Sequence, residues 1–172
     1  MTWTAPQITR TDEILTGDER RQLQNFLDRH RDTLLWKCSG LTADQLKLAP
    51  VPTTTLTLLG LVRHMAEVER GWFRHTAAAQ DGSPIYCSDD NVDGDFDDVP
   101  DADAEADFAT YRRELALCDA AVAGLPLDHE ATRPRGDTFS LRWIYLHMIE
   151  EYARHNGHAD LLREAIDGAT GE

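Results

Sequence analysis

The chain has 172 residues, a hydrophobic content of 41% and a formal net charge of −14. This length can bury a core without disulfides, and the composition is that of a globular rather than a disordered protein. The excess of acidic residues argues against nucleic acid or anionic membrane surfaces as partners, because phosphate groups bind basic faces. We therefore expect a single domain over residues 1–172.

The cysteines and the N-terminus indicate the compartment. The chain has three cysteines, Cys38, Cys87 and Cys118, and no CxxC motif. The odd number excludes a paired disulfide framework, and the spacing excludes a thiolate zinc site. The first residues show no basic region followed by an apolar run, so we expect no signal peptide. No stretch approaches the roughly 18 apolar residues of a membrane span. These features predict a reduced, cytoplasmic protein.

Residues 1–16 are expected to be an irregular lead-in, after which acidic residues favour the first turn of a helix. Its inward stripe is predicted to consist of Leu23, Phe26, Leu27, His30 and Leu34. We interpret His30 as a hydrogen-bonded core histidine, because no second ligand-type residue lies one turn away. A short turn capped by Thr42 follows this helix.

A second long helix is predicted over residues 56–79. Its inward stripe comprises Leu61, His64, Met65, Val68 and Trp72. His64 is therefore a histidine embedded in an apolar helix face. Four charged residues fall outside this stripe and are interpreted as solvated: Arg63, Glu67, Glu69 and Arg70.

Residues 80–101 are rich in aspartate and show no clear periodicity. The spacing of Asp89, Asn91, Asp93 and Gly94 matches the first half of an EF-hand loop. The match then fails, because the position of the bidentate glutamate is a proline. We interpret the segment as an acidic surface loop and leave weak cation binding open.

The third helix is predicted over residues 103–124 and the fourth over residues 140–167, with an irregular crossing between them. The buried stripe of the third helix is expected to be Phe108, Tyr111, Leu115, Cys118 and Val122. Thr138 or Ser140 caps the fourth helix and Gly168 ends it. No segment shows the alternation of a strand. Four long helices with a long connection between the second and third predict an all-α, four-helix bundle.

The fourth helix carries the most informative pattern. Glu151 and His155 lie one turn apart inside its apolar stripe. Burying a bare carboxylate costs at least several kcal/mol, so these groups need a partner. Together with His64 they supply two nitrogens and one oxygen, with open positions as in catalytic metal sites. Zinc suits this set, and nickel, iron(II), cobalt and manganese are alternatives.

The same residues admit other interpretations than a metal site. Glu151 and His155 could pair with each other, or with arginines, as a buried polar cluster. His147 and His158 flank the same face, either as partners that hold the metal ligands in place or as surface histidines. A di-iron site requires Glu-x-x-His on two helices, which is absent. A Gly-x-Ser-x-Gly elbow and a glycine-rich phosphate loop are also absent.

Two segments, Leu58–Phe73 and Trp143–Asp160, resemble the DinB/YfiT-like superfamily. Within it, the chain resembles an actinobacterial branch similar to the N-terminal domain of the mycothiol-dependent maleylpyruvate isomerase. The similarity in order and spacing extends over about residues 12–168. It implies a four-helix bundle with a divalent metal whose three ligands fall on His64, Glu151 and His155.

The resemblance also implies a chemistry. A low-molecular-weight thiol, of the mycothiol type, would bind the metal as a thiolate and attack a small electrophile, giving S-transfer, isomerisation or detoxification. The expected partners are this small-molecule thiol and the electrophile, with a homodimer left open. Two other functions stay open, a non-catalytic metal-binding or stress-related helical bundle and a metal-free helical interaction module.

Overall fold

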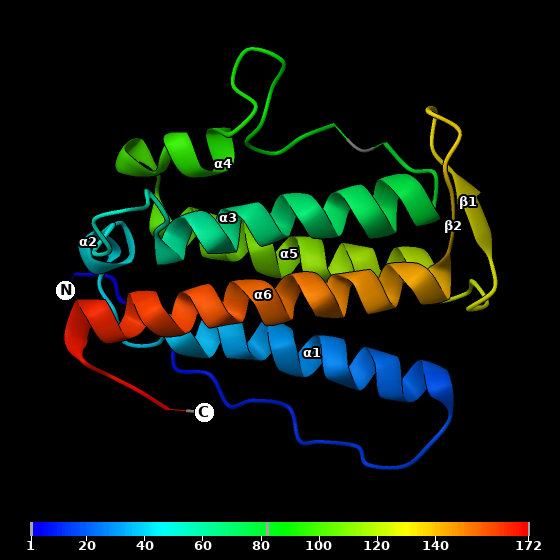
Figure 1. The fold of residues 1–172 in the computed structure, drawn as a ribbon, viewed down its shortest axis with the longest axis horizontal. Helices are drawn as coiled ribbons and strands as arrows, with labels where there is room; N and C mark the ends of the chain where they lie inside the picture. Colours follow the sequence, from blue (N-terminus) through cyan, green and yellow to red (C-terminus); the bar gives the residue numbers. More distant parts are fainter. Residues whose placement is uncertain (1, 82, 172) are drawn as a thin grey trace.

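The computed structural model describes residues 2–81 and 83–171, and it is predominantly helical (Figure 1). Four long helices lie side by side: α1 (Glu19–Cys38), α3 (Leu58–Glu69), α5 (Ala104–Val122) and α6 (Leu141–Asp167). The short helices α2 (Ala43–Leu46) and α4 (Gly94–Asp97) lie at one end and on the outside of α3. Within the described residues, no helix combines the length and apolarity that crossing a bilayer requires.

Each long helix begins at a residue whose side chain accepts a hydrogen bond from the first turn. These capping residues are Asp18, Thr57, Asp103 and Ser140. The predicted caps at Thr42 and Ser140 are confirmed, and Thr42 forms a reciprocal capping box with Gln45. Gly168 ends α6 with a φ of +76°, a left-handed conformation that glycine adopts at little cost.

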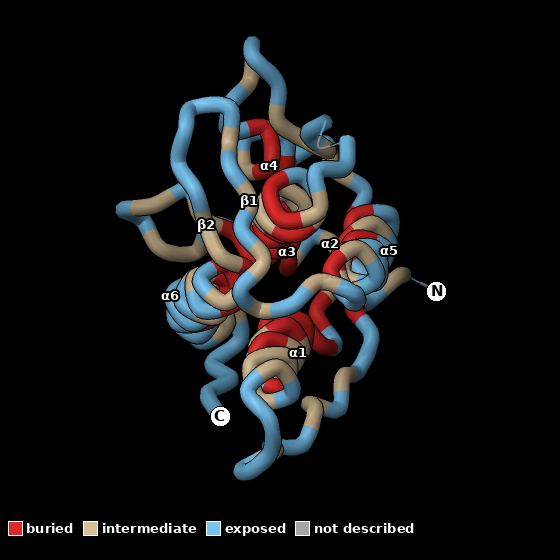
Figure 2. The backbone as a smooth tube through the Cα atoms, turned by 90° about the vertical axis from the view of Figure 1, so that its right-hand side faces the viewer, coloured by how far each residue is buried: buried red, intermediate tan, exposed pale blue. Residues whose placement is uncertain are grey.

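The core lies between the facing sides of the four long helices (Figure 2). The predicted inward stripe of α5 is confirmed at Phe108, Tyr111, Cys118 and Val122, all of which are buried. The prediction for α1 is wrong at Phe26, whose side chain is exposed. The most extensive helix contacts in the described part of the chain join α1 to α6 and α3 to α5.

After α3 the chain continues without a break into a π-helix, η1 (Arg70–Ala77). The two elements together account for the predicted second helix. Within η1 the Thr76 hydroxyl donates to the Gly71 carbonyl at 2.8 Å. The wider winding of a π-helix is rare and is often found at functional sites.

The expectation that the chain contains no strand is wrong. β1 (Glu130–Thr132) and β2 (Thr138–Ser140) form an antiparallel hairpin in which Ala131 pairs with Phe139. Three-residue strands are too short to show alternation in the sequence. The hairpin lies at the end of the molecule where η1 ends and α6 begins (Figure 1).

The expectation of an acidic surface loop over residues 80–101 is wrong in part. The segment contains α4 and a turn of 3₁₀-helix, η2 (Val99–Asp101), and it packs along α3. The approach is close, because a Cβ atom on Gly60 would lie 2.7 Å from the Phe96 ring. This packing carries Asp95 to a position where its side chain is buried.

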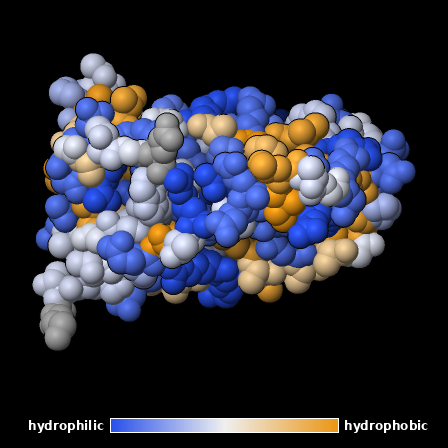
Figure 3. All heavy atoms as spheres, turned by 90° about the horizontal axis from the view of Figure 1, so that it is seen from below, coloured by the Kyte–Doolittle hydropathy of each residue, from blue (hydrophilic) through white to orange (hydrophobic). Residues whose placement is uncertain are grey.

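The face nearest the N-terminal segment and α1 is largely hydrophilic, with a hydrophobic area right of centre (Figure 3). Exposed apolar side chains of this part of the chain include Leu15 and Phe26. Scattered exposed apolar residues of this kind are usual in folded proteins.

Candidate metal centre and adjoining groove

The three predicted ligands lie on the facing sides of α3 and α6, where His155 contacts both of the others. Glu151 and His155 lie one turn apart on α6, with His155 Nε2 3.6 Å from Glu151 Oε2. His64 reaches them from α3, and its ring centroid lies 4.8 Å from that of His155. His64 therefore lies beside His155, a residue 91 positions further along the chain.

His64 is held by a residue that the sequence did not single out. Its Nδ1 lies 2.7 Å from Asp95 Oδ2, and its ring packs against Phe96 at 5.1 Å between centroids. Asp95 is buried with 4% of its surface exposed. A carboxylate on one ring nitrogen fixes the tautomer and leaves Nε2 as the free donor atom, an arrangement common behind metal-bound histidines.

His155 is neutral at pH 7. Its pKa is lowered to about 4, chiefly by burial and then by the neighbouring His64, while Glu151 opposes the shift. His158 lies beside it, with the two Nδ1 atoms 3.4 Å apart. A neutral imidazole keeps a lone pair available, which is the state that metal binding requires.

Glu151 is less buried than its place in the apolar stripe predicts. Its side chain is 17% exposed, and that of His155 is 13% exposed. His147 Nε2 lies 3.4 Å from one carboxylate oxygen, and Arg154 Nη1 lies 3.3 Å from the other. The alternative of a polar cluster is thus partly realised, since Glu151 has cationic or hydrogen-bonding neighbours on its own helix.

The two flanking histidines have different surroundings. His147 stacks on Trp143 at 4.8 Å and meets the edge of Trp72 at 4.7 Å. His158 packs against His155, with the ring centroids 5.4 Å apart. Both therefore touch a predicted ligand, His147 through Glu151 and His158 through His155.

Over residues 2–81 and 83–171, no three His, Cys, Asp or Glu side chains are arranged closely enough to form a recognisable metal-binding group. The trio of His64, Glu151 and His155 therefore stays a prediction. Its fit to a divalent ion rests on the chemistry of the donors, a carboxylate-anchored histidine, a neutral histidine and a carboxylate.

A hollow of about 340 Å³ opens beside His64. Its lining includes apolar surface from Val68, Trp72 and Phe96. Trp72 also contacts Phe139 and Trp143, at centroid distances of 5.1 and 5.3 Å. The candidate centre thus adjoins a cavity with an aromatic wall.

Behind the centre, a buried ion pair joins α1 to α3. Arg31 donates to both carboxylate oxygens of Glu69, from Nε at 2.7 Å and from Nη2 at 2.8 Å. Glu69 also accepts from the Tyr152 hydroxyl at 2.9 Å, and that hydroxyl lies 2.8 Å from the Tyr111 hydroxyl. Tyr152 directly follows Glu151, so this network fixes the part of α6 that carries the candidate ligands.

The prediction that the charged residues of α3 and η1 are solvated is therefore wrong. Arg63 is buried against Asp107, and Glu67 accepts three backbone N–H bonds from residues 85–87. Arg70 pairs with Glu114. All of these partners lie on other elements, so the periodicity of one helix does not reveal them.

The three cysteines are free thiols with raised pKa values. Burial raises the pKa of Cys38 to about 12, and burial also raises those of Cys87 and Cys118. At neutral pH none of them is a thiolate to an appreciable extent. None of the three cysteines is therefore activated as a nucleophile by its surroundings.

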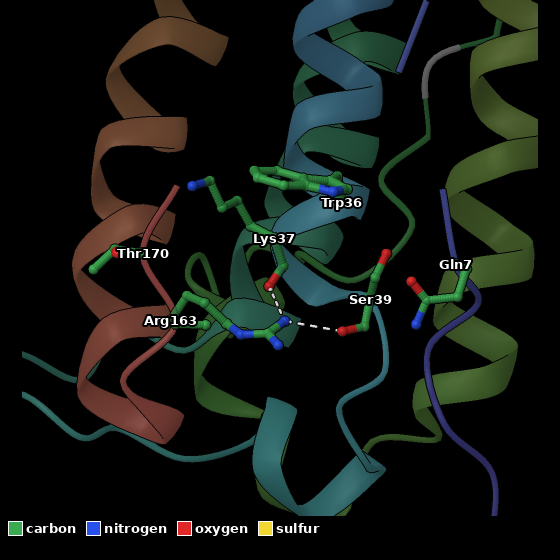
Figure 4. A pocket seen from close by; sticks show the side chains of 7 residues that line it. Gln7, Trp36, Lys37, Ser39, Arg163 and Thr170 are labelled. Atoms are coloured by element: carbon green, nitrogen blue, oxygen red, sulfur yellow. Dashed lines mark hydrogen bonds between the residues drawn. The ribbon is translucent and has the colours of Figure 1, made fainter. Parts of the chain in front are cut away.

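A second hollow, of about 250 Å³, lies between the ends of α1 and α6 (Figure 4). Its lining residues are Gln7, Trp36, Lys37, Ser39, Arg163, Ala169 and Thr170. Arg163 donates to the carbonyls of Lys37 and Ser39 and pairs with Asp167. Its charge is thus used to close the C-terminal end of α1.

The sequence matches the family described as Mycothiol-S-transferase over residues 22–168. No curated protein and no solved structure gives a match. The family match extends over nearly the whole chain and includes every residue of the candidate centre, from His64 to His155.

Proposed function

The chain belongs to the mycothiol-S-transferase family, and from this membership we propose that it transfers a mycothiol-type thiol to a small electrophile, using a divalent ion. The family match is the observation that carries the proposal. The resemblance to DinB/YfiT-like proteins is confirmed by this match. We interpret the four long helices as the four-helix bundle of that superfamily.

We assign the ion to His64, Glu151 and His155. The support is their proximity and the Asp95 carboxylate on His64 Nδ1, which orients Nε2 as a donor. Zinc is the first choice for two nitrogens and one oxygen, with nickel, iron(II), cobalt and manganese as alternatives. When bound, such an ion lowers the pKa of a thiol so that it is a nucleophile at neutral pH.

The protein's own residues orient the reactants. The thiol proton passes to solvent, the sulfur forms a bond to the electrophilic carbon, and the leaving group departs with its electron pair. An electrophile without a leaving group, such as a conjugated double bond, takes up a proton at the carbon next to the one that the sulfur attacks. Trp72 and Phe96 supply an apolar wall for the electrophile in the hollow beside His64. The raised pKa values of the cysteines support a thiol supplied from solution.

The test uses protein purified without a polyhistidine tag. Its metal content is measured directly, and the zinc-loaded protein is mixed with mycothiol and monochlorobimane, whose thioether is fluorescent. We expect bound metal and a rate above that of the free thiol. His64→Ala, Glu151→Gln and His155→Ala should each lose both. The control is His129→Ala, a histidine whose Nε2 lies 3.1 Å from the Ala77 carbonyl oxygen, and it should retain both.

The outcomes distinguish a transferase, a non-catalytic metal-binding protein and a protein without a metal centre. Metal binding without any rate over a panel of thiols would refute the transferase and favour a non-catalytic metal-binding protein. Full metal occupancy in His64→Ala would remove that residue from the ligand set. A chain that binds no metal after loading with zinc or nickel would refute the centre itself.

A further inference from the structure

Arg133, in the turn of the β1–β2 hairpin, is held in one orientation. Its guanidinium carbon lies 3.7 Å from the centre of the Trp72 ring, and its Nε donates to Thr76 Oγ1 at 3.0 Å. Its backbone N–H donates to the Asp137 carbonyl at 2.9 Å. A guanidinium stacked on an indole and bonded through Nε keeps two terminal nitrogens that can bind a second group as a fork.

This cation has no ionic partner in the described part of the chain. No carboxylate of residues 2–81 or 83–171 lies within 4.0 Å of it, and its terminal nitrogens donate to none of these residues. Burial lowers the pKa of Arg133, and Arg135 adds to this effect while Asp137 opposes it. A half-buried guanidinium with two free donor groups is suited to binding an anion.

Three hollows meet at Arg133. It lines the hollow beside His64, of about 340 Å³, and two further hollows of about 220 and 450 Å³. Gly71 lines both the first and the largest, and a Cβ atom added to it would meet nothing within 4 Å. The hollows therefore adjoin over Gly71 and form a groove from His64 to the hairpin, which we call the Arg133 groove.

The winding of η1 shapes this groove. The π-helix supplies three residues of the groove. Gly71 leaves space over the helix, Trp72 lines the groove with an aromatic ring, and Thr76 binds Arg133. The i to i+5 winding of η1 inserts an extra residue relative to an α-helix. Glycine at position 71 leaves the space over the helix free.

Two of the four acidic groups that line the groove are already bonded. Glu67 accepts three backbone N–H bonds, and Asp95 is held by His64. Asp93 lines the far side with Val92, and Asp137 lies next to the exposed Arg135. The hollow of about 220 Å³ contains no carboxylate among its lining residues, so Arg133 dominates the charge at this end.

We propose that Arg133 binds the carboxylate of the electrophilic substrate, whose apolar body lies against Val68 and Phe96 in the hollow beside His64 and whose reactive carbon points towards His64. The description of the ligand as an electrophilic substrate rests on the proposed function. The anion site itself rests on the geometry of Arg133 alone. A cavity of about 150 Å³ accommodates benzene, so a hollow of about 340 Å³ accommodates a substituted ring with its carboxylate.

The test is calorimetric and needs no turnover. The probes are 4-chloro-3-nitrobenzoate and the neutral 4-chloro-3-nitrobenzamide, titrated into protein without thiol. We expect the benzoate to bind the wild type at least about tenfold more tightly, which corresponds to about 1.4 kcal/mol. Arg133→Gln should remove this preference. The control Arg112→Gln, an exposed position on α5 that lines none of the three hollows, should keep it.

A second variant tests the groove without changing its charge. Gly71→Leu would fill the free space over η1 and should weaken both probes, with circular dichroism unchanged. Equal affinity of the two probes for the wild type, or an unchanged preference in Arg133→Gln, would overturn the proposal. Unchanged affinity in Gly71→Leu would place the probes elsewhere and also overturn it.

A kinetic arm separates this inference from the proposed function. With mycothiol and metal-loaded protein, the thiol sulfur bonds to the ring carbon that carries chlorine, chloride leaves with its electron pair, and the proton passes to buffer. A binding preference without any transfer would refute the transferase and keep the anion site. Transfer to both probes with equal kcat/KM, unaffected by Arg133→Gln, would keep the transferase and refute the anion site.

Discussion

Replacing Arg31 with methionine should destabilise the protein strongly, because it leaves Glu69 without its cation. The pair is bidentate, at 2.7 and 2.8 Å, and the two side chains are 4% and 0% exposed. The Tyr152 hydroxyl is the only other donor to Glu69 in the described part of the chain. A carboxylate at this depth would then be almost uncompensated.

The size of the effect follows from this burial. Removing one partner of a buried ion pair typically costs about 3–5 kcal/mol, chiefly through the charge that remains. For a chain of this length, such a loss lowers the melting temperature by roughly 6–20 °C. The double variant Arg31→Met/Glu69→Met should recover most of the loss, because two apolar side chains of similar volume remove both charges together.

Urea denaturation followed by circular dichroism measures the free energies of unfolding of the single and double variants. Arg142 and Glu19 form a matched control, since they also pair through two hydrogen bonds but are 41% and 55% exposed. Arg142→Met should shift the midpoint little. If Arg31→Met shifted it no more than Arg142→Met, or if the double variant were less stable than the single one, the reasoning would be refuted.

Three further predictions concern the same region. Asp95→Asn should weaken metal binding about 10–100-fold, because it removes the carboxylate that binds His64 Nδ1. Competition with a chromogenic chelator measures the affinity, and an unchanged value would contradict this role of Asp95. Burial raises the pKa of Glu114, but hydrogen bonds from two arginines outweigh it and hold the pKa below its ordinary value of 4.5. Glu114 therefore contributes stability above pH 4.5 that is lost as the pH falls through its lowered pKa, and Glu114→Gln should show a shallower acid dependence in urea titrations. Gly94→Ala should destabilise the protein by about 1–3 kcal/mol, since its Cβ would lie 2.4 Å from the Tyr86 carbonyl oxygen; a wild-type midpoint would contradict it.

The beginnings and ends of the helices were predictable because they depend on local chemistry. Ser140 accepts a hydrogen bond from the backbone three residues later, and Gly168 adopts a left-handed conformation next to the helix it ends. Both signals are contained in a few consecutive residues. The proximity of Glu151 and His155 was predictable for a related reason, since they lie one turn apart within one helix.

The partners of these residues were not predictable in the same way. Glu69 falls outside the apolar stripe of its own helix, yet it is buried because Arg31 on α1 lies opposite. Asp95 is one of many aspartates in its segment, and only the packing of α4 on α3 distinguishes it. Arg133 lies in a turn between strands too short to be recognised from alternation.

The contact between α1 and α6 has a consequence for synthesis. α1 ends at residue 38 and α6 begins at residue 141, so α1 emerges from the ribosome long before the helix it packs against most extensively. Until then the side of α1 that packs on α6 is not buried by that helix. Folding intermediates with exposed apolar surface are prone to aggregation. Glu151 and His155 lie on the same helix, so His64 can contact neither of them until α6 has been synthesised. Translation of the last helix would therefore complete the hydrophobic core and the candidate metal centre in the same event.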